Sequence, residues 1–223
     1  MLIIALDAST SVTAVAVARA EEGGREVLAD ISVSARGASE TLLPAIHAAL
    51  NLAGEELASA ERLLAGVGPG TFTGIRIAAA TARALSLSTG APLSTNSTLA
   101  ALAAPALSCH ADVLAVLDAR RGQIFVQRFS VAGPTTKISC VKPEDLLAGG
   151  APLVVGDGAV RYRDVLSGLG RVPPDGSSLH RVTATGHVLS ADLAPVDAEG
   201  LVPIYIREPD AEARRGLNPW SRP

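Results

Sequence analysis

The chain has 223 residues, of which 48% are hydrophobic, 18% charged and 3% aromatic. An apolar-rich chain with few charges can bury enough surface to offset the entropy lost on folding, which excludes an intrinsically disordered protein and predicts an aliphatic core. The formal net charge is −3 and the only lysines are Lys137 and Lys142. This composition excludes a broad polycationic surface for nucleic acids and a phosphate loop ending in Gly-Lys-Ser/Thr.

Cysteine spacing and the apolar segments bear on location. Cys109 and Cys140 lie in no Cys-x-x-Cys spacing, so neither a zinc site nor a disulfide framework is indicated. Residues 2–6 are apolar, are followed by an acid and have no basic flank, so we expect a strand there and not a secretory signal. The longest apolar stretch spans about 12 residues, short of the ~20 needed to cross a bilayer. We expect a soluble cytoplasmic protein with no membrane contact.

The first quarter of the chain predicts three strands followed by a helix. Apolar runs separated by turn-like segments suggest sequential strands of a mixed sheet, at residues 2–6, 12–18 and 26–33. Apolar side chains then recur on one helical face from residue 39 to 53. Ser39 and Thr41 are both candidate N-caps of this helix, and Pro44 is tolerated only in its first turn.

A strand at 62–67 leads into a glycine-rich turn at 68–74 and a helix that continues to residue 89. Apart from Arg76 and Arg83, which share one side, this helix is apolar or small almost all round. A helix without a polar face is buried on more than one side, so we expect one side to face another protein. Further strands are predicted at 91–94, 113–118, 124–129, 153–155 and 202–206, and helices from 97 to Pro105, at 159–166 and at 183–194.

The glycine-rich turn admits two interpretations. Gly68 and Gly70 allow close backbone approach, and the following helix would direct free N–H groups at an anion, assisted by the hydroxyls of Thr71 and Thr73. Equally, the glycines make a tight corner between strand and helix, and such patterns often carry no ligand. Asp7, at the end of the first strand, is likewise either a ligand for a phosphate or hydrated metal, or an acceptor for backbone N–H groups of its turn.

No catalytic or metal-binding set is evident in the sequence. The four histidines show no spacing typical of metal ligands, and no Gly-x-Ser-x-Gly elbow is present. Asp118 and Arg120 are interpreted as a local ion pair or turn contact. We therefore predict no catalytic residues and no metal site.

Five sequence blocks resemble those of the TsaB (YeaZ) family, in the same order along the chain. They are Leu-Ile-Ile-Ala-Leu-Asp-Ala-Ser-Thr at 2–10, Ser-Glu-Thr-Leu-Leu-Pro at 39–44, Gly-Val-Gly-Pro-Gly-Thr-Phe-Thr-Gly-Ile-Arg at 66–76, Asp-Ala-Arg-Arg-Gly at 118–122 and Pro-Ile-Tyr-Ile-Arg at 203–207. The block at 66–76 is the most specific. The resemblance covers nearly the whole chain.

The resemblance implies an α/β fold of the actin-like ATPase, ribonuclease H-like group, with a complete N-terminal lobe and a reduced second lobe. We expect the first lobe at 1–100 together with a returning helix near 183–194, the second lobe at 101–207 and a disordered tail at 208–223. Two departures from the family pattern, Ala38 in place of a histidine and Phe125 in place of a tyrosine, leave side-chain roles there open.

The resemblance also implies a function. Family members are noncatalytic subunits that bind the catalytic subunit TsaD and, with the ATPase TsaE, support threonylcarbamoyl transfer to the adenosine 3′ of the anticodon in ANN-decoding tRNAs. The family's homodimer and its TsaD complex use the two helices that correspond to residues 39–53 and 71–89. The interface expected from this is Leu42, Leu43, Ile46, Leu50, Ile75, Ala78, Ala79, Ala82 and Leu85. Contact with tRNA is expected to be indirect. No cofactor is expected to be tightly bound, and the TsaD interface is the candidate site for ATP or ADP.

An alternative is an autonomous ATP-dependent kinase or ATPase of the same fold, which would use Asp7, Thr71 and Thr73. Its second-lobe nucleotide contact would come from the Gly-Asp-Gly turn at 156–158. The chain length argues against this alternative, because such enzymes close two full lobes over the nucleotide.

Overall fold

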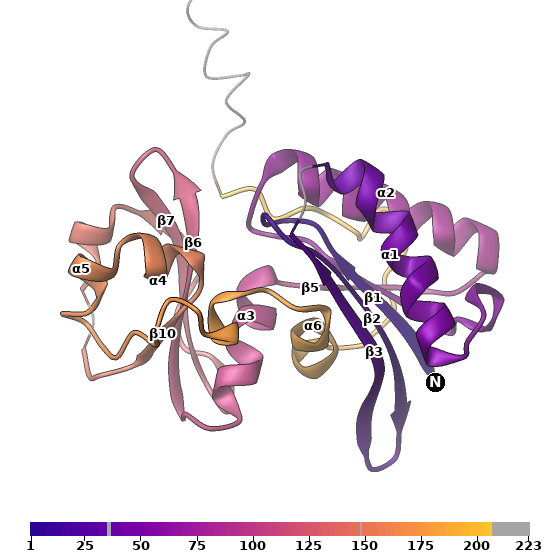
Figure 1. The fold of residues 1–223 in the computed structure, drawn as a ribbon, viewed down its shortest axis with the longest axis horizontal. Coiled ribbons are helices and arrows are strands. Elements are labelled where there is room, and N and C mark those ends of the chain that lie inside the picture. Colours follow the sequence, from indigo (N-terminus) through magenta and orange to yellow (C-terminus); the bar gives the residue numbers. More distant parts are fainter. Residues whose placement is uncertain (35–36, 148, 207–223) are drawn as a thin grey trace, which may run out of the picture.

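The computed structural model describes residues 1–34, 37–147 and 149–206, and within them two β-sheets lie side by side (Figure 1). The first sheet contains β1 (Leu2–Asp7), β2 (Thr13–Glu21), β3 (Gly24–Val33), β4 (Arg62–Gly66) and β5 (Leu93–Asn96). The second contains β6 (Asp112–Arg120), β7 (Gln123–Ser130), β8 (Gly133–Pro134), β9 (Ser139–Val141) and β10 (Leu153–Val155). The three sequential strands predicted at the start of the chain are confirmed.

The first sheet has the order β3-β2-β1-β4-β5 and places β1 at its centre. β2 pairs antiparallel with both β1 and β3, whereas β1–β4 and β4–β5 are parallel pairs. Every residue of β1 is buried, as expected for a continuous apolar strand covered on both faces. The second sheet runs β10-β6-β7-β8, and β9 pairs with β7 on the side of the hairpin turn.

Helices cover both faces of the first sheet. The helices of the described residues are α1 (Ala38–Ala53), α2 (Phe72–Thr89), α3 (Thr98–Leu107), α4 (Asp157–Arg161), α5 (Arg163–Leu166) and α6 (Ala184–Ser190), with 3-10 turns η1 (Leu57–Ser59), η2 (Pro143–Asp145) and η3 (Ser178–His180). Of these, α4 packs on β6 and β10 of the second sheet, and α5 contacts α4. α1 and α2 lie on the outer face, whereas α3 and α6 lie between the two sheets (Figure 1). Because α6 contacts β1 to β3 and α3 contacts β6 and β7, this helix pair joins the two halves.

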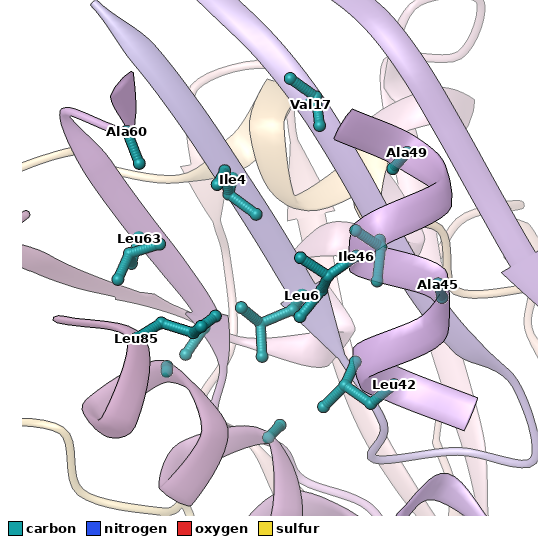
Figure 2. Packing of buried hydrophobic residues seen from close by; sticks show 14 of the residues in the cluster. Ile4, Leu6, Val17, Leu42, Ala45, Ile46, Ala49, Ala60, Leu63 and Leu85 are labelled. Atoms are coloured by element: carbon teal, nitrogen blue, oxygen red, sulfur yellow. The ribbon is translucent and has the colours of Figure 1, made fainter. Parts of the chain in front are cut away.

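The core under α1 and α2 is made of aliphatic side chains. Figure 2 shows Leu42 and Ile46 of α1 directed at the sheet, where Ile4 and Leu6 of β1 project toward them. The alternate residues of β1, Ile3 and Ala5, face the opposite way and pack with residues of α6. This alternation is the period of a strand, and it gives β1 a role in two hydrophobic clusters.

The start of α1 differs from the prediction. The N-cap is Gly37, in a left-handed conformation with φ 95°, and no side chain caps the helix, so the assignment of Ser39 or Thr41 as N-cap is wrong. Pro44 lies inside the helix and not in its first turn. It removes one backbone hydrogen bond to the Glu40 carbonyl, but both residues are exposed, so water can replace the missing donor.

Several later predictions also need correction. Residues 202–206 form no strand, although the Ile204 N–H donates to the Val67 carbonyl at 2.8 Å. The helix predicted at 159–166 is divided into α4 and α5, and the one at 183–194 ends at Ser190. Short strands β8 and β9 were not predicted, because their few residues carry no periodic pattern. The predicted tail at 208–223 lies outside the described residues.

Candidate functional site

Asp7 lies at the centre of a buried polar network. Its Oδ1 accepts hydrogen bonds from Ser9 N–H at 2.6 Å and from the Ser9 hydroxyl at 2.7 Å. Its Oδ2 is bonded to Thr98 Oγ1 at 3.0 Å and His187 Nε2 at 2.8 Å. Asp7 is 1% exposed and His187 is fully buried. The network therefore connects the end of β1 to the start of α3 and to α6.

The imidazole of His187 is held on its other side as well. Nδ2 of Asn96, the last residue of β5, lies 3.3 Å from His187 Nδ1. The same Nδ2 donates a hydrogen bond to Ser190 Oγ at 2.7 Å. Burial by itself would raise the pKa of Asp7, but the hydrogen bond and charge of His187 and the hydrogen bonds of Ser9 outweigh it and hold the pKa below its ordinary value. Asp7 is thus a buried carboxylate whose partners are supplied by its own chain.

The glycine-rich turn lets the backbone approach this network closely. A Cβ on Gly66 would lie 2.0 Å from Asp7 Oδ2, and a Cβ on Gly74 would lie 1.8 Å from the Ala8 carbonyl oxygen. Gly70 makes a similarly close approach to the backbone of Ser9, and the Gly68 carbonyl accepts a hydrogen bond from Thr98 N–H at 2.8 Å. These contacts account for the glycines by close packing, which was one of the two interpretations of the sequence.

Thr71 and Thr73, the hydroxyl residues predicted to contact an anion, lie at the start of α2, where the Thr71 N–H donates to the Ser9 carbonyl at 2.6 Å. The Thr71 hydroxyl accepts the Gly74 N–H at 3.3 Å and so acts as the N-cap of α2. Both threonines line an open pocket of about 570 Å³ between the starts of α1 and α2, together with Thr10, Ser11 and other residues. Asp7 is buried and does not line this pocket, so a ligand in the pocket would not reach all the predicted anion contacts.

A second pocket, of about 310 Å³, lies between the two halves of the chain. Its walls include Thr10 and Ser11 of the β1–β2 turn and Asp157, Arg161 and Arg181 of the second half. Desolvation by the surrounding protein raises the pKa of Asp157, and the charge of Asp118 adds to this effect. Asp157 of the Gly-Asp-Gly turn at 156–158 thus lines a pocket that it shares with the β1–β2 turn.

The two outer helices direct their predicted interface side chains inward. Of the nine residues expected at a partner interface, eight are at most 8% exposed, and only Leu43, at 50%, is on the surface. The buried eight are Leu42, Ile46, Leu50, Ile75, Ala78, Ala79, Ala82 and Leu85. They belong to the chain's own core, and a surface role for these side chains is therefore corrected. Periodicity identified the apolar face of each helix but could not say that the sheet covers it.

A different set of apolar residues is exposed on α1 and α2. On α1 they are Leu43, Pro44, Ala48 and Leu52, and on α2 they are Ala80, Ala84 and Leu87. Leu52 and Leu87 are 73% and 87% exposed. We call these seven residues the outer helical surface. Within the chain, α2 is therefore buried on one side only, and the expectation that another side of it faces a second protein stays a prediction.

The sequence did not indicate a cluster at the start of α2. Arg76 Nε donates to the Tyr205 hydroxyl at 3.0 Å, and the guanidinium lies 3.7 Å from the centroid of the Phe72 ring. The Phe72 and Tyr205 rings are 5.3 Å apart. Arg76 and Tyr205 both fall within family-like blocks, but 129 positions separate them, and no local pattern predicts their contact.

Within residues 1–34, 37–147 and 149–206, no group of three or more His, Cys, Asp or Glu side chains is arranged to hold a metal ion. No helix in this described part of the chain is long and apolar enough to cross a membrane.

Comparison with known proteins agrees with the fold. The family described as "TsaD: tRNA N6-adenosine threonylcarbamoyltransferase" matches residues 31–156. An uncharacterized protein of Mycobacterium tuberculosis is 30% identical over 217 residues, covering 94% of this chain and 93% of that protein. The tRNA threonylcarbamoyladenosine biosynthesis protein TsaB of Bacillus subtilis is 31% identical over 126 residues, and that of Escherichia coli is 34% identical over 127. Each TsaB alignment covers 56% of this chain and 53% of the relative.

The solved structure of YeaZ from Pseudomonas aeruginosa superposes with a TM-score of 0.73 at 25% identity, covering 92% of this chain and 99% of that one. The sheet order and helix layers define an α/β protein of the actin-like, ribonuclease H-like class. On the matches to both sequence and structure, the chain belongs to the TsaB (YeaZ) family, within the wider group to which TsaD belongs.

Proposed function

We propose that this protein is a noncatalytic subunit in the formation of threonylcarbamoyladenosine in tRNA, and that it acts by binding a TsaD-like catalytic subunit. The observation that carries the proposal is the membership of the TsaB family, whose named members are biosynthesis proteins for this modified nucleoside. The exposed apolar residues of the outer helical surface support it, because such a patch on a soluble domain typically marks a site of protein contact.

The Asp7 network supports a noncatalytic role over the alternative of an autonomous kinase or ATPase. In that alternative, Asp7 would contact the nucleotide or its metal. Here its carboxylate is buried and already accepts hydrogen bonds from Ser9, Thr98 and His187. A ligand would have to displace these partners and expose a carboxylate that is now sealed, at considerable cost.

The remaining parts of the proposal concern the assembly. A TsaE-like ATPase would join the complex, tRNA would contact this chain only indirectly, and a homodimer would use the same outer helical surface as TsaD. ATP or ADP would bind only where the chain meets TsaD. Thr71 and Thr73, on the wall of the open pocket beside α1 and α2, are the predicted contacts that remain accessible to it.

Reconstitution of tRNA modification with purified TsaD-like and TsaE-like proteins tests the proposal. We expect threonylcarbamoyladenosine to form with the chain and to fall to background without it. Leu87→Asp should lose the TsaD complex and the activity, because it places a charge in the surface that would be buried. Leu147→Asp is the matched control: Leu147 is 95% exposed but lies in the second half of the chain, away from α1 and α2.

Modification that proceeds equally well without the chain would contradict the proposal. The kinase alternative has its own measurement, which is calorimetry of the isolated chain with Mg-ATP. Tight, stoichiometric binding with turnover would favour that alternative, and we expect neither.

A further inference from the structure

The guanidinium of Arg76 is held in place before any partner arrives. It stacks on the Phe72 ring at 3.7 Å and lies 5.9 Å from the Tyr205 ring, and its Nε donates to the Tyr205 hydroxyl. A long side chain fixed by stacking and one hydrogen bond has already lost much of the rotamer entropy that binding would otherwise cost. Arg76 is nonetheless an exposed residue.

Tyr205 is itself positioned by a segment that returns from the far end of the chain. Arg83, two turns after Arg76 on α2, donates from Nε to the Ala198 carbonyl and from Nη2 to the Leu201 carbonyl, both at 2.9 Å. Leu201 is fully buried, and the Ile204 N–H donates a hydrogen bond to the Val67 carbonyl. The two arginines that share one side of α2 therefore hold residues 198–206 along that helix.

Among the described residues, the contacts of Arg76 involve its Nε and the face of its guanidinium. Within the described part of the chain, no acceptor lies against its terminal nitrogens Nη1 and Nη2. Two parallel N–H groups of a guanidinium match the two oxygens of a carboxylate, and this bidentate pair is stronger and more directional than a contact made by lysine.

The surroundings of Arg76 favour an acidic partner. One turn after Arg76, Ala80 begins the exposed face that continues through Ala84 to Leu87, so the guanidinium lies at one end of the outer helical surface. α2 carries two arginines and no acidic residue, and the only acid of α1 is Glu40. An apolar surface with a positive charge at one end is complementary to a helix that combines apolar residues with a carboxylate.

We propose that Arg76 is the charged anchor of the outer helical surface, and that it binds an Asp or Glu carboxylate on a TsaD-family subunit through its terminal nitrogens. Phe72 and Tyr205 are positioning residues that fix the guanidinium, and Arg83 acts one step further away by holding the segment that carries Tyr205. This inference rests on the proposed function and adds to it the residue and the partner chemistry of the contact.

Titration of a purified TsaD-family protein into the full-length chain tests the anchor. Truncation of a hydrogen-bonded charge pair at an interface costs enough that Arg76→Ala should weaken binding by about 30-fold. Arg76→Lys should also weaken it, by about tenfold, because an ammonium keeps the charge but lacks the fork and the stacking. Tyr205→Phe keeps the ring and removes the hydroxyl, so we expect a smaller loss. Arg181→Ala, at an exposed arginine of the second half of the chain, is the matched control and should bind as the wild type does.

A purely structural role for Arg76 predicts different results. If the role were purely structural, Arg76→Ala would lower the unfolding temperature of the isolated chain, and changing the partner's charge would not alter binding. Our proposal expects Arg76→Glu to lose binding and to regain it when one acid on the partner's helices is replaced by lysine. If the wild type binds TsaD and Arg76→Ala binds it with the same affinity, the proposed role of Arg76 is wrong but the proposed function stands. The same conclusion follows if the substitution affects only self-association of the chain. Failure of the wild type to bind TsaD would instead contradict the proposed function.

Discussion

At the scale of single residues, the most consequential contact joins Asp7 to His187. The two side chains are 180 positions apart in the sequence, and both are buried. The imidazole of His187 takes the place that water would otherwise occupy beside the Asp7 carboxylate, at the end of the central strand. Its loss would leave a buried charge without its main partner, which is among the more expensive defects in a protein interior.

We predict that His187→Ala lowers the free energy of unfolding by about 3–5 kcal/mol, because Asp7 stays buried without the imidazole. Urea denaturation monitored by circular dichroism measures the change. The double variant Asp7→Ala with His187→Ala removes both partners and should cost less than the sum of the two single changes. Additive losses would show that the pair does not act as a unit.

The pH dependence of stability follows from the lowered pKa of Asp7. The ordinary pKa is 3.8, and in the fold it is lower. The stability that this group contributes is therefore fully present above about pH 4 and is lost as the pH falls through the pKa of the folded state. We predict that the stability difference between wild type and Asp7→Asn narrows between pH 5 and pH 3, measured by chemical denaturation at each pH. A difference independent of pH over that range would contradict the assignment.

At the scale of elements, the connection from β4 to α2 depends on close backbone contact with the β1–β2 turn. Gly74 belongs to the first turn of α2 and approaches the Ala8 carbonyl so closely that no side chain fits. In an open helix, alanine would be the more favourable residue. The tertiary contact thus reverses the local preference at this position.

We predict that Gly74→Ala destabilises the protein by about 2 kcal/mol or more, because the added methyl group forces α2 away from the turn. Thermal unfolding is the measurement. Gly23→Ala is the matched control, since the Cβ position of Gly23 has no atom within 4 Å, and its unfolding temperature should stay close to that of wild type. Equal stability of both variants would show that the turn can relax.

At the scale of the whole molecule, α3 and α6 determine how the two halves are connected. α3 packs on β6 and β7, α6 packs on the first sheet, and the two helices contact each other (Figure 1). Asp30 extends the connection, since its Oδ2 accepts the Thr185 N–H at the start of α6 at 2.9 Å. Because the helix pair packs on both sheets, one half of the molecule cannot separate from the other without exposing part of this packing.

We predict a single cooperative unfolding transition for the chain, with coincident curves by circular dichroism and calorimetry, because neither half can open without uncovering α3 or α6. Two resolved transitions would mean that the lobes are independent units. The lobe boundaries expected from the sequence, 1–100 and 101–207, remain predictions until such a measurement is made.

The sequence determined the order of the main strands and helices, because strand and helix periodicities are local properties of the chain. It also determined the family, because the block at residues 66–76 and its companions occur in a specific order. Boundaries were less predictable where backbone geometry decided them, as at Gly37, which begins α1 without a side-chain cap.

Only the tertiary structure decided which apolar faces are covered. Periodicity found Leu42 and Ala78 on apolar helical faces, but it could not tell a face buried by the chain's own sheet from one left for a partner. Likewise, Asp7 had two interpretations until the fold brought His187 to it, and Arg76 had no evident role until Tyr205 reached it. Contacts between residues far apart in sequence depend on the packing of whole elements, and no local pattern contains them.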